Sequence, residues 1–219
     1  MNARAFFFLL IVSTLIACGG QEAASHGEAA ATTPAADSTP AADSTPAAEP
    51  TASSAPAPVT SRTPAAGDTI SAPGASFTLP ANWQAETPSS SMRLAQAAIP
   101  GDAGNGQLTV FYFGPGGGGG VDANIDRWVG QMDVAAGSQP TRETFDVGSF
   151  RVTWTDVEGT IKPSTMGVGP TEPQPGSRLL GAVVEGAEGP WFFKATGPAD
   201  TLAAERDAFL FMLRSVTAP

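Results

Sequence analysis

Three polar side chains on one predicted helix could bind a ligand or a partner. Asn124, Arg127 and Gln131 follow one another at i, i+3 and i+7, a spacing that places them along one flank of a helix. A guanidinium such as that of Arg127 can hold a carboxylate or a phosphate through two parallel hydrogen bonds. The alternative is a plain exposed stripe in which Arg127 pairs with Asp122, Asp126 or a neighbouring loop. We take Asn124, Arg127 and Gln131 as the candidate binding surface.

The same helix also carries carboxylates. Asp122 and Asp126 are four residues apart, and Asp133 follows shortly after them. Such groups could work as acid and base or hold a hard cation. The same spacing is also typical of a solvated helix face, so we assign no metal site.

Lys194 interrupts an apolar segment and is a second binding candidate. The segment 191–196 reads WFFKAT, which indicates a strand with a single charged residue inside it. Side chains alternate between the two faces of a strand, so this lysine either serves a site or points outward from the sheet.

The residue types of most hydrolases are missing from the folded part of the chain. The only histidine is His26, and no histidine or cysteine follows residue 69. Ser-His and Cys-His nucleophilic systems and the common zinc sites are therefore excluded there. The glycine run 116–120 precedes the predicted helix, but no Gly-Lys-Ser/Thr follows it and Asp122 would repel a phosphate. We expect no enzyme activity, no catalytic residues and no cofactor.

The N-terminus has the pattern of a bacterial lipoprotein signal. A short basic start precedes the uncharged apolar run 5–16, which is too short to span a bilayer. It ends in Leu15-Ile16-Ala17-Cys18, which matches a lipobox, and Cys18 is the only cysteine in the chain. The alternative is an ordinary secretory signal with an incidental cysteine. We predict a signal peptide over 1–17, lipidation of Cys18, and no intramolecular disulfide.

A low-complexity segment separates this signal from the rest of the chain. Residues 18–69 contain almost only Ala, Pro, Ser, Thr, Gly, Asp and Glu, with a hexad repeated from Thr33, Thr39 and Thr45. Such a composition cannot bury enough apolar surface to offset its ordering entropy, so we predict a disordered tether. Gly19, rather than aspartate, after Cys18 favours the outer membrane if the cell is Gram-negative.

Residues 70–219 are predicted to form one α+β domain, a largely antiparallel sheet covered by helices. Its four tryptophans lie in apolar periodic segments and are expected in the core. We predict a bend at 156–159, an exposed loop over 162–177, strands at 76–79, 92–99, 107–113, 144–147, 149–161, 178–185 and 190–196, and helices at 121–132 and 200–216.

Two short patterns within this element order resemble the PsbP-like superfamily. Phe77-x-Leu79-Pro80-x-x-Trp83 opens the resemblance and Phe209-x-x-x-Leu213-x-Ser215 closes it, over roughly residues 72–217. The resemblance implies an α/β/α sandwich and an accessory or adaptor role, and it brings no catalytic residues. The fold transfers better than the function.

Two functional hypotheses remain open. The favoured one is a membrane-anchored, extracytoplasmic and non-enzymatic module that binds an envelope protein or cell-wall partner. The alternative is a small-ligand or metal-binding domain that uses carboxylates and Arg127. From residue 70 onward the chain has 15 acidic and nine basic residues without a basic stripe, so nucleic acid is not an expected partner.

Overall fold

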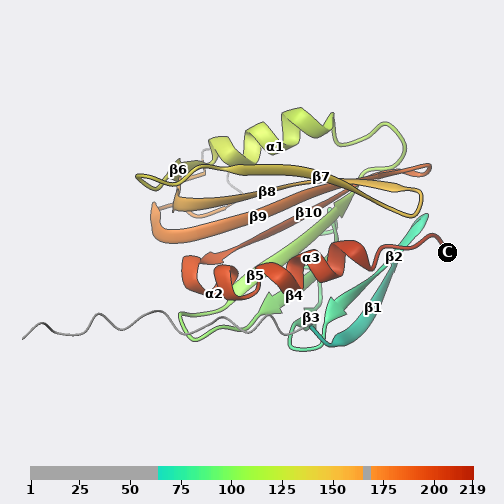
Figure 1. Cartoon of the computed structure of the whole chain (residues 1–219), viewed down its shortest axis with the longest axis horizontal. Helices are drawn as coiled ribbons and strands as arrows, with labels where there is room; N and C mark the ends of the chain where they lie inside the picture. The colour runs from blue at the N-terminus through green and yellow to red at the C-terminus, as the bar shows by residue number, and fades with distance from the viewer. Residues whose placement is uncertain (1–63, 165–168) are drawn as a thin grey trace, which may run out of the picture. The chain divides into compact units, whose positions relative to one another are not determined.

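The computed structural model describes residues 64–164 and 169–219 (Figure 1). The predicted signal peptide, Cys18 and most of the predicted tether lie outside these residues. The described part forms a single α+β domain, mostly antiparallel sheet with a few helices, as the sequence predicted. Its first strand begins at Ala66, four residues before the predicted domain boundary. Its elements are β1 (Ala66–Ala72), β2 (Ala75–Pro80), β3 (Gln84–Glu86), β4 (Arg93–Ile99), β5 (Gly106–Tyr112), α1 (Val121–Gly130), β6 (Met132–Val134), β7 (Thr141–Val147), β8 (Phe150–Ile161), β9 (Gln174–Gly186), β10 (Gly189–Pro198), α2 (Ala199–Ala204) and α3 (Arg206–Arg214).

An 8-stranded sheet forms the centre of the domain. Its strand order is β3-β4-β5-β10-β9-β8-β6, and β7 also pairs with β8. Every pairing in it is antiparallel, and β9 and β10 form a hairpin. A separate two-stranded sheet joins β1 to β2. The central strands β8, β9 and β10 are largely buried because side chains from elsewhere cover both of their faces.

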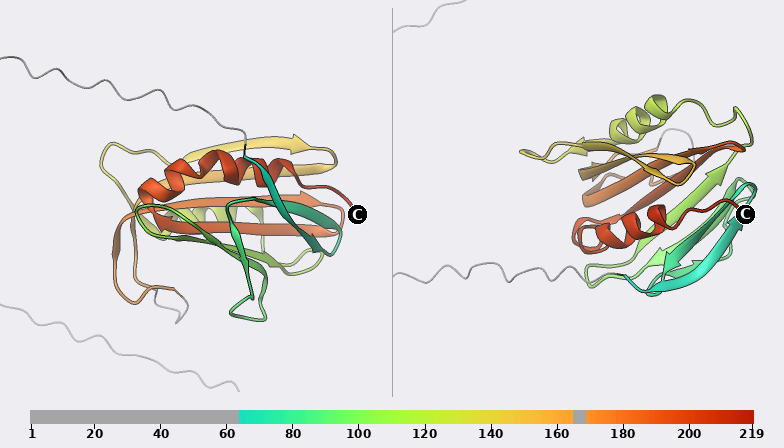
Figure 2. Two further views of the ribbon diagram at one scale, coloured as in Figure 1. Left: turned by 90° about the horizontal axis from the view of Figure 1, so that it is seen from below. Right: turned by 45° about the vertical axis from the view of Figure 1, so that its right-hand side comes forward.

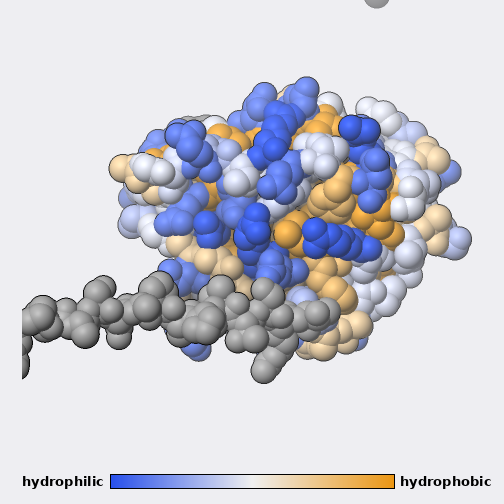
Figure 3. Space-filling view, in the orientation of Figure 1, coloured by the Kyte–Doolittle hydropathy of each residue, from blue (hydrophilic) through white to orange (hydrophobic). Residues whose placement is uncertain are grey.

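Helices cover opposite faces of this sheet (Figure 2). The helix α1 packs on one face through Ile125 and Trp128, over Val157, Val183 and Phe192. On the other face, α2, α3 and the β1–β2 sheet enclose the larger core. Hydrophilic residues lie along the outer side of α1 in the space-filling view (Figure 3), as expected of an amphipathic helix.

The four tryptophans are all in the core, as predicted. Their exposed fractions are 5% for Trp83, 4% for Trp128, 1% for Trp154 and 1% for Trp191. Trp128 is the only one of them on the α1 side, and it lies over Gly181 of β9. A Cβ atom at Gly181 would be 2.5 Å from the ring carbon Cε3 of Trp128. The missing side chain therefore lets the helix approach the sheet.

The predicted bend at 156–159 is wrong. The strand β8 runs through it, and its pairing with β9 continues from Arg151 to Gly159. Gly159 does not mark a bend. A side chain is not tolerated at this position, because a Cβ there would be 2.0 Å from the Asp133 carbonyl oxygen. The glycine therefore accommodates the neighbouring strand β6.

Several predicted boundaries also differ from the structure. The strand β9 begins at Gln174, so the end of the predicted loop is part of the sheet, and α1 ends at Gly130 because Met132 starts β6. The strands β1 and β3 were not predicted; neither contains a fully buried side chain, and β3 has only three residues. In such segments, pairing with a neighbouring strand decides the structure more than propensity does.

The predicted C-terminal helix is divided in two at Glu205. Its carboxylate accepts hydrogen bonds from Trp83 Nε1 at 2.7 Å and from Asn82 Nδ2 at 2.9 Å. These contacts link the junction between α2 and α3 to the segment that follows β2. Tertiary hydrogen bonds of this kind are not visible in helical periodicity.

The contact between Trp128 and Gly181 gives a prediction about stability. Gly181→Ala is expected to lower the free energy of unfolding by about 1–3 kcal/mol, because the added methyl group collides with a buried ring. Urea denaturation of the purified protein measures this change. Gly130→Ala is the matched control at the exposed end of α1, where a Cβ would meet nothing within 4 Å; there alanine should be neutral or stabilising. Equal stability of Gly181→Ala and wild type would contradict the packing argument.

Candidate functional site

The predicted surface of Asn124, Arg127 and Gln131 is not a continuous exposed stripe. Asn124 is only 1% exposed, and its Nδ2 donates to the carbonyl oxygens of Gly118 and Gly120 at 2.9 Å each. It is a structural residue that fastens the glycine run to the first turn of α1. The prediction of a surface role for Asn124 is therefore wrong, because the run folds back over that side of the helix.

Arg127 is exposed, as predicted, and does not pair with the carboxylates of its own helix. Its Nη2 donates a hydrogen bond to Asn124 Oδ1. The structure gives it no carboxylate partner in residues 64–164 and 169–219. Its guanidinium keeps most of its N–H donors for another group.

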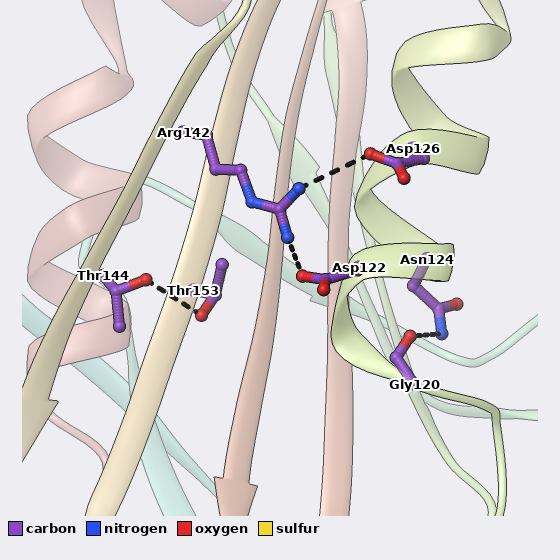
Figure 4. A network of polar contacts seen from close by, with 7 residues as sticks. All are labelled: Gly120, Asp122, Asn124, Asp126, Arg142, Thr144 and Thr153. Atoms are coloured by element: carbon purple, nitrogen blue, oxygen red, sulfur yellow. Dashed lines mark hydrogen bonds and ion pairs between the residues drawn. The ribbon is translucent and has the colours of Figure 1, made fainter.

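The carboxylates of α1 are neutralised from a different element. Arg142 of β7 forms ion pairs with Asp122 and, at 3.5 Å, with Asp126. Figure 4 shows both carboxylates pointing toward Arg142, whereas Asn124 points toward Gly120. The carboxylates and Arg127 therefore do not converge on one site, contrary to the arrangement that the alternative hypothesis requires.

Asp133 does not join the other carboxylates of this region in a common binding site. It pairs with Lys162 at 3.2 Å just after β8. In the described part of the chain, no three His, Cys, Asp or Glu side chains are grouped so that they could hold a metal ion.

Lys194 lies on the α1 side of the sheet and meets the end of that helix. It pairs in register with Gly181 of β9, the glycine beneath Trp128. Its ammonium Nζ donates to Gln131 Oε1 at 2.6 Å. The structure thus brings together Arg127, Gln131 and Lys194, of which the first two were predicted as one surface and the third as a separate candidate.

The electrostatic environment of Lys194 is unfavourable for its charge. Burial and, to a smaller extent, the positive charge of Arg127 together lower the pKa of this lysine from 10.5 to about 8. No carboxylate of the described residues forms an ion pair with it. Lys194 is still mainly protonated at pH 7, because its pKa remains above that value.

A row of polar side chains continues from Lys194 across the sheet. Lys194 pairs in register with Thr109 of β5, and Thr109 pairs with Gln96 of β4. Both neighbours are mostly buried, at 9% and 8% exposed. The sequence analysis did not predict this row. The available signal was the presence of polar residues inside otherwise apolar strands, but only the strand register shows which of them are neighbours.

A surface hollow of about 740 Å³ lies at the end of the same strands. Gln107 of β5 and Thr196 of β10 line it, together with the beginning of β9 and the first residues of α2. Thr196 is two residues after Lys194, so the two side chains share a face of β10. The hollow therefore opens next to the row that contains Lys194.

A buried ion cluster on the opposite face was not predicted. Asp156 of β8 is 7% exposed and lies 2.9 Å from Arg178 Nε and 3.2 Å from Arg206 Nε. Only the contact with Arg206 has hydrogen-bond geometry. Burial raises the pKa of Asp156, while the two arginines act in the opposite direction. The cluster ties β8 and β9 to the first residue of α3, a structural role.

No protein-family model matches the chain, and no curated protein is similar to it in sequence. Among solved structures, a protein from Bacteroides thetaiotaomicron VPI-5482 is similar at 12% sequence identity with a TM-score of 0.35. The match covers 68% of this chain and 47% of that one. No helix in the described part of the chain is long and apolar enough to cross a membrane.

The shifted pKa of Lys194 gives a prediction about stability and pH. Lys194→Met is expected to raise the free energy of unfolding at pH 7 by about 1–3 kcal/mol, because it removes a charge from an unfavourable place. Above pH 8 the folded protein loses this proton while the unfolded chain retains it to about pH 10.4, so wild-type stability rises relative to the variant. The advantage of Lys194→Met should therefore shrink between pH 8 and pH 10.

Urea denaturation of both proteins at pH 7, 8, 9 and 10 measures this difference. Arg151→Gln is the control, since Arg151 is an exposed cation of β8 with no ion pair among the described residues. An advantage of Lys194→Met that is the same at every pH would contradict the assigned cause.

Proposed function

We propose that the chain is a lipid-anchored, extracytoplasmic lipoprotein whose domain is a non-enzymatic binding or accessory module for a partner in the cell envelope. The lipobox at Cys18 and the composition of residues 18–69 support the anchor and the tether. The absence of histidine and cysteine beyond residue 69 supports a binding role over hydrolytic catalysis. The helices on both faces of an antiparallel sheet agree with the proposed PsbP-like α/β/α architecture.

One observation carries the binding role. Gln131, directly after α1, accepts a hydrogen bond from Lys194 of β10, and Arg127 of α1 is close enough to act on the charge of that lysine. The two cations have no carboxylate partner within the described ranges. Arg142, Arg178 and Arg206 have such partners, whereas Arg93, Arg151 and Arg214 have none among the described residues; what distinguishes Arg127 and Lys194 is that they lie close to each other. Two like charges that lie close together without a counter-charge lower the stability of the fold, and such arrangements are typical of binding and active sites. We therefore place the partner surface at Arg127 and Gln131 and add Lys194 to it.

A small-ligand domain remains the second candidate. The observation in its favour is the hollow of about 740 Å³ near Gln107 and Thr196, a volume within the usual range of ligand pockets. Its carboxylates would not be those of α1, since Arg142 engages Asp122 and Asp126.

Crosslinking in whole envelopes tests the partner surface. The wild-type lipoprotein should retain a specific envelope protein or cell-wall fragment, and the double variant Arg127→Ala with Gln131→Ala should lose most of it. Arg151→Gln, which also removes an exposed arginine, should behave as wild type. Retention of the same partner by the double variant would rule out this surface.

Lipidation is tested separately. Cys18→Ala is expected to abolish labelling by a radioactive fatty acid and to move the protein from the membrane fraction to the soluble or unprocessed fraction, because the acyl chains supply the anchor. Membrane fractionation and mass spectrometry of the mature N-terminus measure this. A Cys18→Ala protein that is processed and membrane-bound like wild type would refute the lipoprotein assignment.

A further inference from the structure

The side chains at the end of α1 offer hydrogen-bond donors. The ammonium of Lys194 has three donors and no acceptor, and within the described residues only Gln131 Oε1 accepts from it. That contact fixes the orientation of the Gln131 amide, since an amide nitrogen facing an ammonium would bring two donors together. The Nε2 group of Gln131 is therefore left with its two N–H donors.

Arg127 adds further donors on the same flank. It is four residues before Gln131 and hence one helical turn away. One of its nitrogens donates to Asn124, and that asparagine is held in turn by the glycine run. The hydrogen bond to Asn124 thus orients the guanidinium group, and its other N–H donors can bind a planar acceptor such as a carboxylate.

The group lacks the negative charge that would balance it. Among residues 64–164 and 169–219, Arg142, Lys162, Arg178 and Arg206 each form an ion pair with a carboxylate. Arg93, Arg151, Arg214, Lys194 and Arg127 form none among these residues, but Lys194 and Arg127 are also close enough for their positive charges to act on each other. A bound anion would relieve this repulsion, whereas a bound cation would increase it.

We propose that Lys194, Gln131 and Arg127 form a binding site for a single oxyanion, a carboxylate or a phosphate group. The inference rests on the proposed function in one respect, because it places this oxyanion on the partner that the same surface binds. Lys194 supplies a point charge, Arg127 a bidentate fork and Gln131 a neutral donor between them. The hollow lined by Thr196 and Gln107 leaves room for the remainder of the molecule that carries the anion.

Titrations with inorganic phosphate and with acetate test the site in the absence of any partner. Nitrogen-15 NMR spectra of the purified protein are recorded at pH 7, with sodium chloride added to keep the ionic strength constant. At least one of the two anions should cause saturable shifts centred on residues 127–131 and 194, with a dissociation constant of about 1–10 mM. Phosphate alone would assign a phosphate-bearing ligand, and acetate alone a carboxylate-bearing one.

Three variants make the result specific. Lys194→Met and Arg127→Gln should each weaken the binding about tenfold or more, whereas Arg151→Gln, which removes one positive charge from β8, should leave it unchanged. The unperturbed spectrum of each variant shows whether it is folded. No saturable shift with either anion, or equal weakening in Arg151→Gln, would overturn the proposal.

The outcomes also separate this site from the proposed function. Anion binding without any crosslinked partner would support the oxyanion site and count against the partner module. If the double variant of Arg127 and Gln131 lost a crosslinked partner but the wild-type protein bound neither anion, the result would support the partner module and count against the oxyanion site.

Discussion

The contact between the Trp128 ring and Gly181 governs how the α1 side of this domain is arranged. A large indole can approach the sheet this closely only where the strand beneath it has no side chain, and β9 provides that place at Gly181. The same glycine pairs in register with Lys194 of the next strand. Seating the tryptophan therefore also brings the last turn of α1, with Gln131, to the lysine. One packing contact thus positions both the helix and the candidate site.

The docked helix has two flanks of different electrostatic character. On one flank, Arg142 of β7 neutralises Asp122 and Asp126, which holds α1 beside β7 through exposed ion pairs of modest energy. On the other flank, Arg127, with Lys194 of β10 near it, has no carboxylate partner among residues 64–164 and 169–219, and neither has Lys194. A helix attached by its acidic flank leaves its basic flank available, which is the physical basis for placing a partner or an oxyanion there.

The opposite face of the sheet has its own fixed point in Asp156. A buried carboxylate with two arginines is costly to desolvate, and removing one partner would leave a buried charge unpaired. Here the cluster joins two central strands to the start of α3. Glu205, the residue directly before α3, accepts a hydrogen bond from Trp83. These polar contacts locate the division between α2 and α3.

Sequence alone determined the class of the domain, the order of most of its elements and the burial of its four tryptophans, because apolar periodicity records which residues face a core. It also predicted that Arg127 and Gln131 share one flank of the helix, since helical spacing places them there. It did not reveal that Asn124 is buried, that Lys194 meets Gln131, or that Arg142 takes the carboxylates of α1. Those facts depend on strand register, on the path of the glycine run and on which strand lies beside the helix. Such contacts join residues up to 63 positions apart, as Gln131 and Lys194 are, and local periodicity carries no information at that range.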